Sequence, residues 1–288
     1  MARQSNETSD DTATTGHSWD GIEEYDRPLP RWWLWTFYAC IVWAVGYWIL
    51  MPSFPLVSDY ARGMLGYSQR EVLADQMAAA RAAQAQYAER IRALPLSQVQ
   101  GDPELLEYAL AAGRSAFAVN CSQCHGQGAE GSRGYPNLND DAWLWGGGLS
   151  AIHQTIRNGV RSGDPDARDS QMPAFLASDL LTRAQIDDTA EFVLSLSGRA
   201  GDAVAAERGR AVFAENCAVC HGPTGQGNQE LGAPNLTSAI WLYGGDKTTV
   251  VETISYARRG VMPAWQGRLD EATVKALAVY VHALGGGQ

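Results

Sequence analysis

The chain has 288 residues and a formal net charge of −10 at pH 7, with 32 acidic against 22 basic side chains. This balance argues against a nucleic-acid-binding protein, because contacts to phosphates need clustered Lys and Arg. An acidic surface suits a basic protein partner, although such surfaces also serve solubility alone. The length corresponds to roughly two domains, each with its own core.

The N-terminal region is polar and then abruptly apolar. Residues 1–26 contain few large apolar side chains, so we predict a mostly disordered tail. Residues 32–58 carry no charge, and Trp32 to about Leu50 could span a hydrocarbon core of ~30 Å with ~20 helical residues. Aromatic residues stand at both ends of this run, and Pro52 and Pro55 end it. No small-residue cleavage site follows, so we interpret 32–58 as a transmembrane anchor and not as a signal peptide.

A helical linker is predicted over residues 59–101. Ser68 and Glu71 form a capping-box pattern at the start of an alanine-rich helix, which runs to about Leu94 and is closed by Pro95. The simpler interpretation is a spacer that holds the following domains away from the membrane. The alternative is a helix that docks on a partner subunit.

The string Cys-x-x-Cys-His occurs twice, and it is the pattern of covalent haem attachment. Two thiols can reach the two vinyl groups of one porphyrin while the adjacent imidazole binds the iron from below. Four of the five cysteines fall in these strings, and the fifth, Cys40, lies in the apolar run. The sequence therefore predicts two haem c groups, bound by Cys121, Cys124 and His125 and by Cys217, Cys220 and His221.

The regions around the two strings repeat each other, which predicts two tandem domains, 102–198 and 202–288. Each repeat has a Pro-Asn-Leu loop, a Trp-rich Gly-Gly segment and a Met-Pro loop before a closing helix. Asp102 and Pro103 mark the start of the first repeat as an N-cap and the first helical turn. The repeats differ mainly by a polar insertion at about 161–171, which we interpret as a loop.

Met172 and Met262 are the candidate sixth ligands, because each precedes a proline at an equivalent place in its repeat. A thioether at that position raises the potential of the iron and blocks small ligands, which leaves an electron-transfer centre. Met172 follows His125, and Met262 follows His221, so we expect each methionine to serve the haem of its own repeat. His153 and His282 each lack a histidine in the other repeat, and we predict that neither is a ligand.

Further residues have expected supporting roles. The carbonyls of Pro136 and Pro234 should accept a hydrogen bond from the ligating imidazoles. Leu138 and Leu236 should pack on the porphyrins, and arginines suit the haem propionates; the candidates are Arg157, Arg258 and Arg259. Helix crossings are expected within each repeat, between Gly113/Phe117 and Phe192 and between Gly209/Phe213 and Tyr280.

Each repeat resembles a class I cytochrome c domain, which implies a mainly α fold. The whole chain, including the stretch Tyr25-Asp-Arg-Pro-Leu-Pro-Arg-Trp-Trp33 before a single anchor, resembles the dihaem subunit of cbb3-type cytochrome c oxidases, the CcoP or FixP family. The resemblance implies electron transfer from soluble or membrane-bound c-type cytochromes. The electrons would pass through a monohaem cytochrome c subunit toward a catalytic haem–copper subunit that reduces oxygen and pumps protons, with small accessory subunits alongside. It also implies that this chain does not itself reduce oxygen.

The expected location is the bacterial inner membrane, with the tail 1–31 in the cytoplasm and the haem domains in the periplasm. Arg27 and Arg31 precede the anchor, as the positive-inside tendency favours, although Arg62 lies close to its other end. Covalent haem attachment outside the cytoplasmic membrane agrees with this orientation.

Three other functions are weighed against this one. The chain could be the dihaem subunit of a periplasmic dehydrogenase or a free-standing membrane cytochrome. A dihaem peroxidase would need a displaceable sixth ligand, which two Met loops disfavour. A zinc or thiol-redox module would contain no covalently bound haem.

Overall fold

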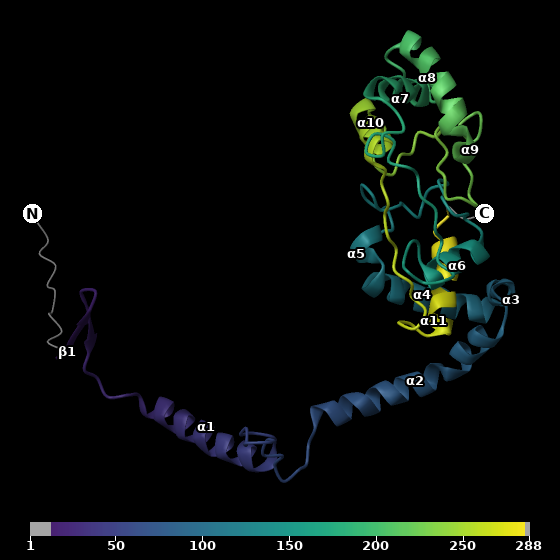
Figure 1. Cartoon of the computed structure of the whole chain (residues 1–288). Coiled ribbons are helices and arrows are strands. Elements are labelled where there is room, and N and C mark those ends of the chain that lie inside the picture. The colour runs from purple at the N-terminus through teal and green to yellow at the C-terminus, as the bar shows by residue number, and fades with distance from the viewer. Residues whose placement is uncertain (1–12, 286–288) are drawn as a thin grey trace, which may run out of the picture. The chain divides into compact units, whose positions relative to one another are not determined.

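The computed structural model describes residues 13–285. The chain divides into two compact units, residues 1–80 and 81–288. Helices account for most of the regular structure, as expected for a mainly α protein, and Figure 1 shows their order along the chain.

The first unit begins with a β-hairpin where we predicted disorder. Strands β1 (Thr14–Trp19) and β2 (Ile22–Tyr25) pair antiparallel. The turn between them is Asp20-Gly21, and both residues have positive φ, 50° and 84°, which matches the twist of paired strands. The prediction for 1–26 is therefore wrong for residues 14–25, because Asp20-Gly21 is a favourable hairpin turn. Residues 1–12 lie outside the described part of the chain.

Helix α1 (Arg31–Leu50) is the predicted anchor. It is long and apolar enough to cross a membrane, and none of its residues is buried against protein. The chain then folds back on the helix end, where the N–H groups of Met64 and Leu65 donate to the carbonyls of Ile49 and Leu50 at 2.9 and 3.1 Å. These bonds satisfy carbonyls that the helix itself leaves without a donor.

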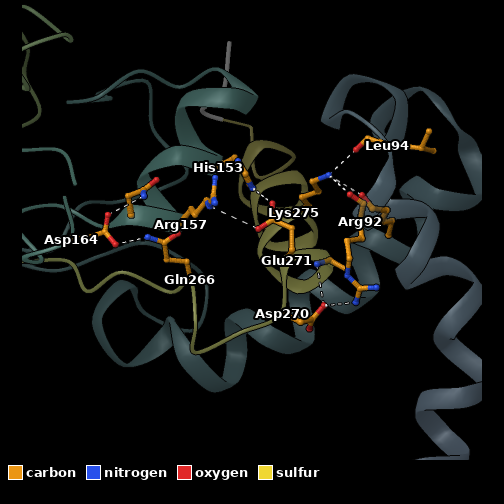
Figure 2. Close-up of polar contacts among 12 residues, drawn as sticks. Arg92, Leu94, His153, Arg157, Asp164, Gln266, Asp270, Glu271 and Lys275 are labelled. Carbon is orange, nitrogen blue, oxygen red and sulfur yellow. Dashed lines mark hydrogen bonds and ion pairs between the residues drawn. The ribbon is translucent and has the colours of Figure 1, made fainter. Parts of the chain in front are cut away.

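Helix α2 (Gln69–Ala93) is the predicted alanine-rich helix, and Ser68 accepts from the N–H of Glu71 at 3.3 Å. Its C-terminal part is more than a spacer, because Ile91 is fully buried in a core with residues of α3 (Leu96–Gly101), α4 and α11. Lys275 Nζ from α11 donates to three carbonyls at the end of α2, those of Ile91, Arg92 and Leu94, at 2.8–3.1 Å (Figure 2). A lysine at a helix C-terminus satisfies unpaired carbonyls, and its positive charge interacts favourably with the negative end of the helix dipole.

The remaining helices follow the repeat of the sequence. The first repeat supplies α4 (Pro103–Asn120), α5 (Ser122–His125), α6 (Leu149–Asn158) and α7 (Arg183–Ser195). The second supplies α8 (Ala203–Asn216), α9 (Ala218–His221), α10 (Lys247–Tyr256) and α11 (Glu271–His282). Most begin at a side-chain cap, and at α7 Thr182 and Gln185 form a complete capping box.

The two repeats exchange their closing helices. A Cβ atom on Gly113 of α4 would lie 2.4 Å from the carbonyl oxygen of Ala276 in α11, and one on Gly209 of α8 would lie 2.0 Å from that of Asp188 in α7. Each glycine therefore allows close approach to the last helix of the other repeat. Figure 1 shows α4 and α6 beside the yellow α11, and α8 and α10 beside α7.

The helix crossings expected within each repeat are therefore wrong. The ring of Phe117 packs on Tyr280 at 5.5 Å between centroids, and Phe192 packs on Phe213 at 5.0 Å. We call α4, α5, α6 and α11 lobe 1, and α7, α8, α9 and α10 lobe 2. Because both repeats have the same pattern of a first helix and a closing helix, the sequence pattern alone does not distinguish the two pairings.

Two loops cross between the repeats, and we call them the crossing segments: one contains Met172 and Phe175, and the other contains Met262. Val160 and Met262 exchange both backbone hydrogen bonds, at 2.9 and 3.0 Å, so the Met262 loop lies against the first repeat. In the same way the N–H of Phe175 donates to the carbonyl of Ile254 at 3.1 Å, which lies in α10 of the second repeat.

Glu191 fixes the connection between the repeats. Its carboxylate, 4% exposed, accepts from Lys247 Nζ at 2.7 Å and from the N–H groups of Gly201 and Asp202 at 2.8 and 3.1 Å. The hydrogen bond from Lys247 is the main cause that lowers the pKa of Glu191, against the opposing effect of its burial.

Candidate haem sites

Lobe 1 contains a cavity of about 670 Å³. Cys121, Cys124 and His125, at the end of α4 and in α5, line one side, and Met262 lines it as well. The rest of the wall is largely apolar and includes Leu138, as we predicted for a porphyrin contact.

Lobe 2 contains an equivalent cavity of about 260 Å³. Cys217, Cys220 and His221 line it together with Leu236, and the methionine in its wall is Met172. All eight predicted haem residues thus line the two cavities, each set against apolar walls.

The methionines are exchanged between the repeats, in contrast to our expectation. Met172 lies in the cavity of His221, and Met262 lies in the cavity of His125. The cause is the same exchange that moves the closing helices, because each methionine lies in the loop before the helix that crosses to the other lobe.

Both candidate ligand histidines contact backbone carbonyls. Nδ1 of His125 lies 3.0 Å from the carbonyl oxygen of Pro136, and Nδ1 of His221 lies 3.0 Å from that of Pro234. This contact selects the tautomer that leaves Nε2 free to bind a metal. Burial lowers the pKa of both imidazoles, which keeps them neutral as ligands must be.

The loop that supplies each carbonyl depends on a glycine. Gly131 and Gly227 have φ of +67° and +81°, and a Cβ atom on either would lie 2.5 Å from a carbonyl oxygen of the same loop. Their N–H groups donate to the carbonyls of His125 and His221 at 2.7 and 2.8 Å. In both lobes, hydrogen bonds therefore connect the Cys-x-x-Cys-His helix to the Pro loop.

The first cysteine of each string is half-buried, and its thiol has a raised pKa. Burial raises the pKa of Cys121 and of Cys217 to about 11, and the neighbouring Cys124 and Cys220 add to the effect. A thiol with such a pKa stays protonated at neutral pH while no group is bound.

An orphaned polar atom in lobe 2 also fits a haem. Nε1 of Trp241 is buried without a hydrogen-bond partner among residues 13–285, and Trp241 lines the lobe 2 cavity. A buried donor of this kind normally has a partner, and a haem propionate is an acceptor of the right chemistry. The cysteine pair, the imidazole, the thioether and this donor together fit a covalently bound haem.

One of the arginines expected at a propionate lies outside both cavities. Arg157 lines neither cavity, and its Nε lies 4.0 Å from Glu271 Oε2 on α11. Arg258 and Arg259 do line the cavities, and so does Arg161, which sequence reasoning missed because it lies in the insertion without a counterpart in the second repeat.

The rival histidines lie elsewhere. Nε2 of His153 lies 3.2 Å from Glu271 Oε1, in a polar cluster that joins α6 to α11 (Figure 2), and Nδ1 of His282 lies 3.5 Å from Gln100 Nε2. Neither histidine lines a haem cavity.

The fold and the two sites define a membrane-anchored dihaem cytochrome c. Family models agree: residues 11–58 match the N-terminal domain of cytochrome oxidase-cbb3, FixP, residues 110–197 match cytochrome c, and residues 204–281 match cytochrome c oxidase, cbb3-type, subunit III.

Curated relatives extend this match to the whole chain. The cbb3-type cytochrome c oxidase subunit FixP of Azorhizobium caulinodans is 54% identical over 96% of this chain and 94% of its own length. The CcoP subunits of Cereibacter sphaeroides and of Azospirillum sp. (strain B510) are 52% and 50% identical, over 96% and 100% of this chain and 95% and 100% of their own lengths. The chain belongs to the CcoP/FixP family of cbb3-type cytochrome c oxidase subunits, and it carries two covalently bound haem c groups.

Proposed function

We propose that the chain relays electrons from a c-type cytochrome, through its two haems, to the catalytic haem–copper subunit of a cbb3-type oxidase. The observation that carries this proposal is the pair of cavities, each with a Cys-x-x-Cys-His string and a methionine. Its partners would be the catalytic subunit, a monohaem cytochrome c subunit, small accessory subunits and a soluble or membrane-bound cytochrome c donor.

The proposed ligand sets are crossed. Cys121 and Cys124 would hold the haem of lobe 1, and His125 and Met262 would bind its iron. In lobe 2 the corresponding residues are Cys217, Cys220, His221 and Met172. When bound, each haem supplies an iron that accepts and returns one electron.

The protein residues restrict that iron to electron transfer. The methionine thioether would favour the ferrous state, raise the potential and fill the position that oxygen or peroxide would need. The Pro136 and Pro234 carbonyls hold the imidazoles in one orientation, so little reorganisation accompanies a change of charge. This arrangement supports a relay over a peroxidase.

A shared wall supports transfer between the haems. Leu144, Leu242 and Tyr243 line both cavities, so the two sites share part of their walls. We propose that both lobes lie in the periplasm, which agrees with the two arginines before α1 and with haem attachment outside the cytoplasm.

The composition of the complex tests this function. Material isolated from native membranes through a tag on this chain should contain haem b and copper besides haem c, and it should consume oxygen with reduced cytochrome c. Haem c alone, at two per chain, would instead identify the subunit of another complex or a free-standing cytochrome.

A further inference from the structure

The wall between the two haem cavities is rich in positive charge. Six residues line both cavities, and three of them are arginines: Leu144, Arg161, Leu242, Tyr243, Arg258 and Arg259. Arg161 is half-buried and lies in the insertion that distinguishes the first repeat.

Arg161 contacts both methionine segments. Its Nε donates to the carbonyl of Gly260 at 2.8 Å, and its Nη1 donates to the carbonyl of Ser170 at 3.1 Å. Gly260 stands two residues before Met262, and Ser170 stands two residues before Met172. One guanidinium therefore joins the two crossing segments at the point where each approaches its cavity.

The backbone of Arg161 adopts a left-handed conformation. It has φ of +50°, which is uncommon for a residue with a side chain. Its N–H donates to the carbonyl of Arg168 at 2.8 Å. The preceding Val160 both donates a backbone hydrogen bond to Met262 and accepts one from it. The surrounding structure thus holds an unfavourable conformation, which is typical of functional positions.

The charge of Arg161 has no carboxylate partner among residues 13–285, and its Nη2 has no hydrogen-bond partner there. Arg258, in the same wall, is paired with Glu252. A half-buried cation without a counterion attracts an anion, and a haem in either cavity brings two carboxylates. This argument rests on the proposed function, since it requires haems in both cavities.

We propose that Arg161 is a positioning residue shared by the two haems, which holds both methionine segments at once and couples the ligation and the potentials of the two centres. A displacement of Arg161 loosens both methionines together. Loss of its charge favours the ferric state of both irons, because a nearby cation disfavours the more positive oxidation state.

The test replaces Arg161 in the full chain, assembled in its complex. In Arg161→Gln, both midpoint potentials should fall, and the near-infrared band of methionine-ligated ferric haem should lose more than half of its intensity. Carbon monoxide should bind both ferrous haems about tenfold more tightly, the factor expected for a lost charge-assisted hydrogen bond. Arg161→Lys keeps the charge but not the two-point contact, so it should loosen both methionines with a smaller fall in potential.

Two variants serve as controls. Arg210→Gln makes the same change of charge at an arginine that is 62% exposed and paired with Glu207, and it should alter neither haem. Trp241→Phe changes a residue of the lobe 2 cavity alone and should shift one potential.

The proposal is overturned if both Arg161 variants leave either haem unchanged. If Arg161→Gln fails to assemble, Arg161→Lys decides alone, and native ligation at one or both haems in that variant contradicts the shared role. Absence of covalent haem from the unaltered chain would instead remove the proposed function itself, so the two failures are distinguishable.

Discussion

The exchange of closing helices predicts which aromatic side chains are energetically coupled. Phe117 and Tyr280 lie 5.5 Å apart between ring centroids, within the range in which an aromatic pair adds about 0.5–1.5 kcal/mol beyond its burial. Phe117 is 2% exposed, so solvent does not weaken the pair. A double-mutant cycle with Phe117→Leu and Tyr280→Leu should therefore give a coupling free energy of about 1 kcal/mol.

The matched cycle combines Phe117→Leu with Phe192→Leu, which is the pair expected if each repeat folded on itself. These residues lie in different lobes, so their effects should add to within about 0.3–0.5 kcal/mol. The free energy of unfolding would be measured on the full chain in detergent by guanidinium titration, followed by circular dichroism in the haem Soret band. Coupling in the Phe117–Phe192 cycle and none in the Phe117–Tyr280 cycle would refute the exchanged fold.

Three further predictions concern the polar contacts. Lys275→Met removes the hydrogen-bond donor to the carbonyls at the end of α2. It should lower the free energy of unfolding by about 2 kcal/mol and speed tryptic cleavage after Arg92. Unchanged cleavage would contradict the contact. Burial lowers the pKa of His153 below 6.5, so the unfolded chain binds the proton more tightly, and stability falls as pH drops through 6.5. His153→Gln should flatten that part of the Tm–pH curve. An unchanged slope would count against a buried, neutral His153. The pKa of Glu191 is lowered below 4.5, so its contribution to stability is present above that pH and is lost as pH falls. The loss of Tm in Glu191→Gln should therefore be largest at neutral pH and shrink on acidification. A loss that stays constant with pH would exclude the ion pair with Lys247 as its cause.

Local chemistry made much of the site predictable from the sequence. The Cys-x-x-Cys-His strings, the Pro136 and Pro234 carbonyls and the two methionines are encoded by short patterns whose spacing has a physical cause. The anchor was equally clear, because 27 consecutive residues without a charge, 32–58, contain a helix long enough to cross a bilayer.

The pairing of the repeats was not predictable in the same way. A closing helix of similar sequence offers a similar surface to either first helix, so no local pattern identifies its partner. The roles of Arg157 and Arg161 depend on that pairing: α11 brings Glu271 to Arg157, and the two crossing segments bring Gly260 and Ser170 to Arg161.

Crossed ligation is the central claim, and chains that retain a single haem test it most directly. In a Cys217→Ser, Cys220→Ser background only the haem of lobe 1 remains, and its near-infrared methionine band can be recorded without overlap. We predict that Met262→Ala abolishes this band and that Met172→Ala leaves it intact. Loss of the band in Met172→Ala, with the band retained in Met262→Ala, would contradict the account.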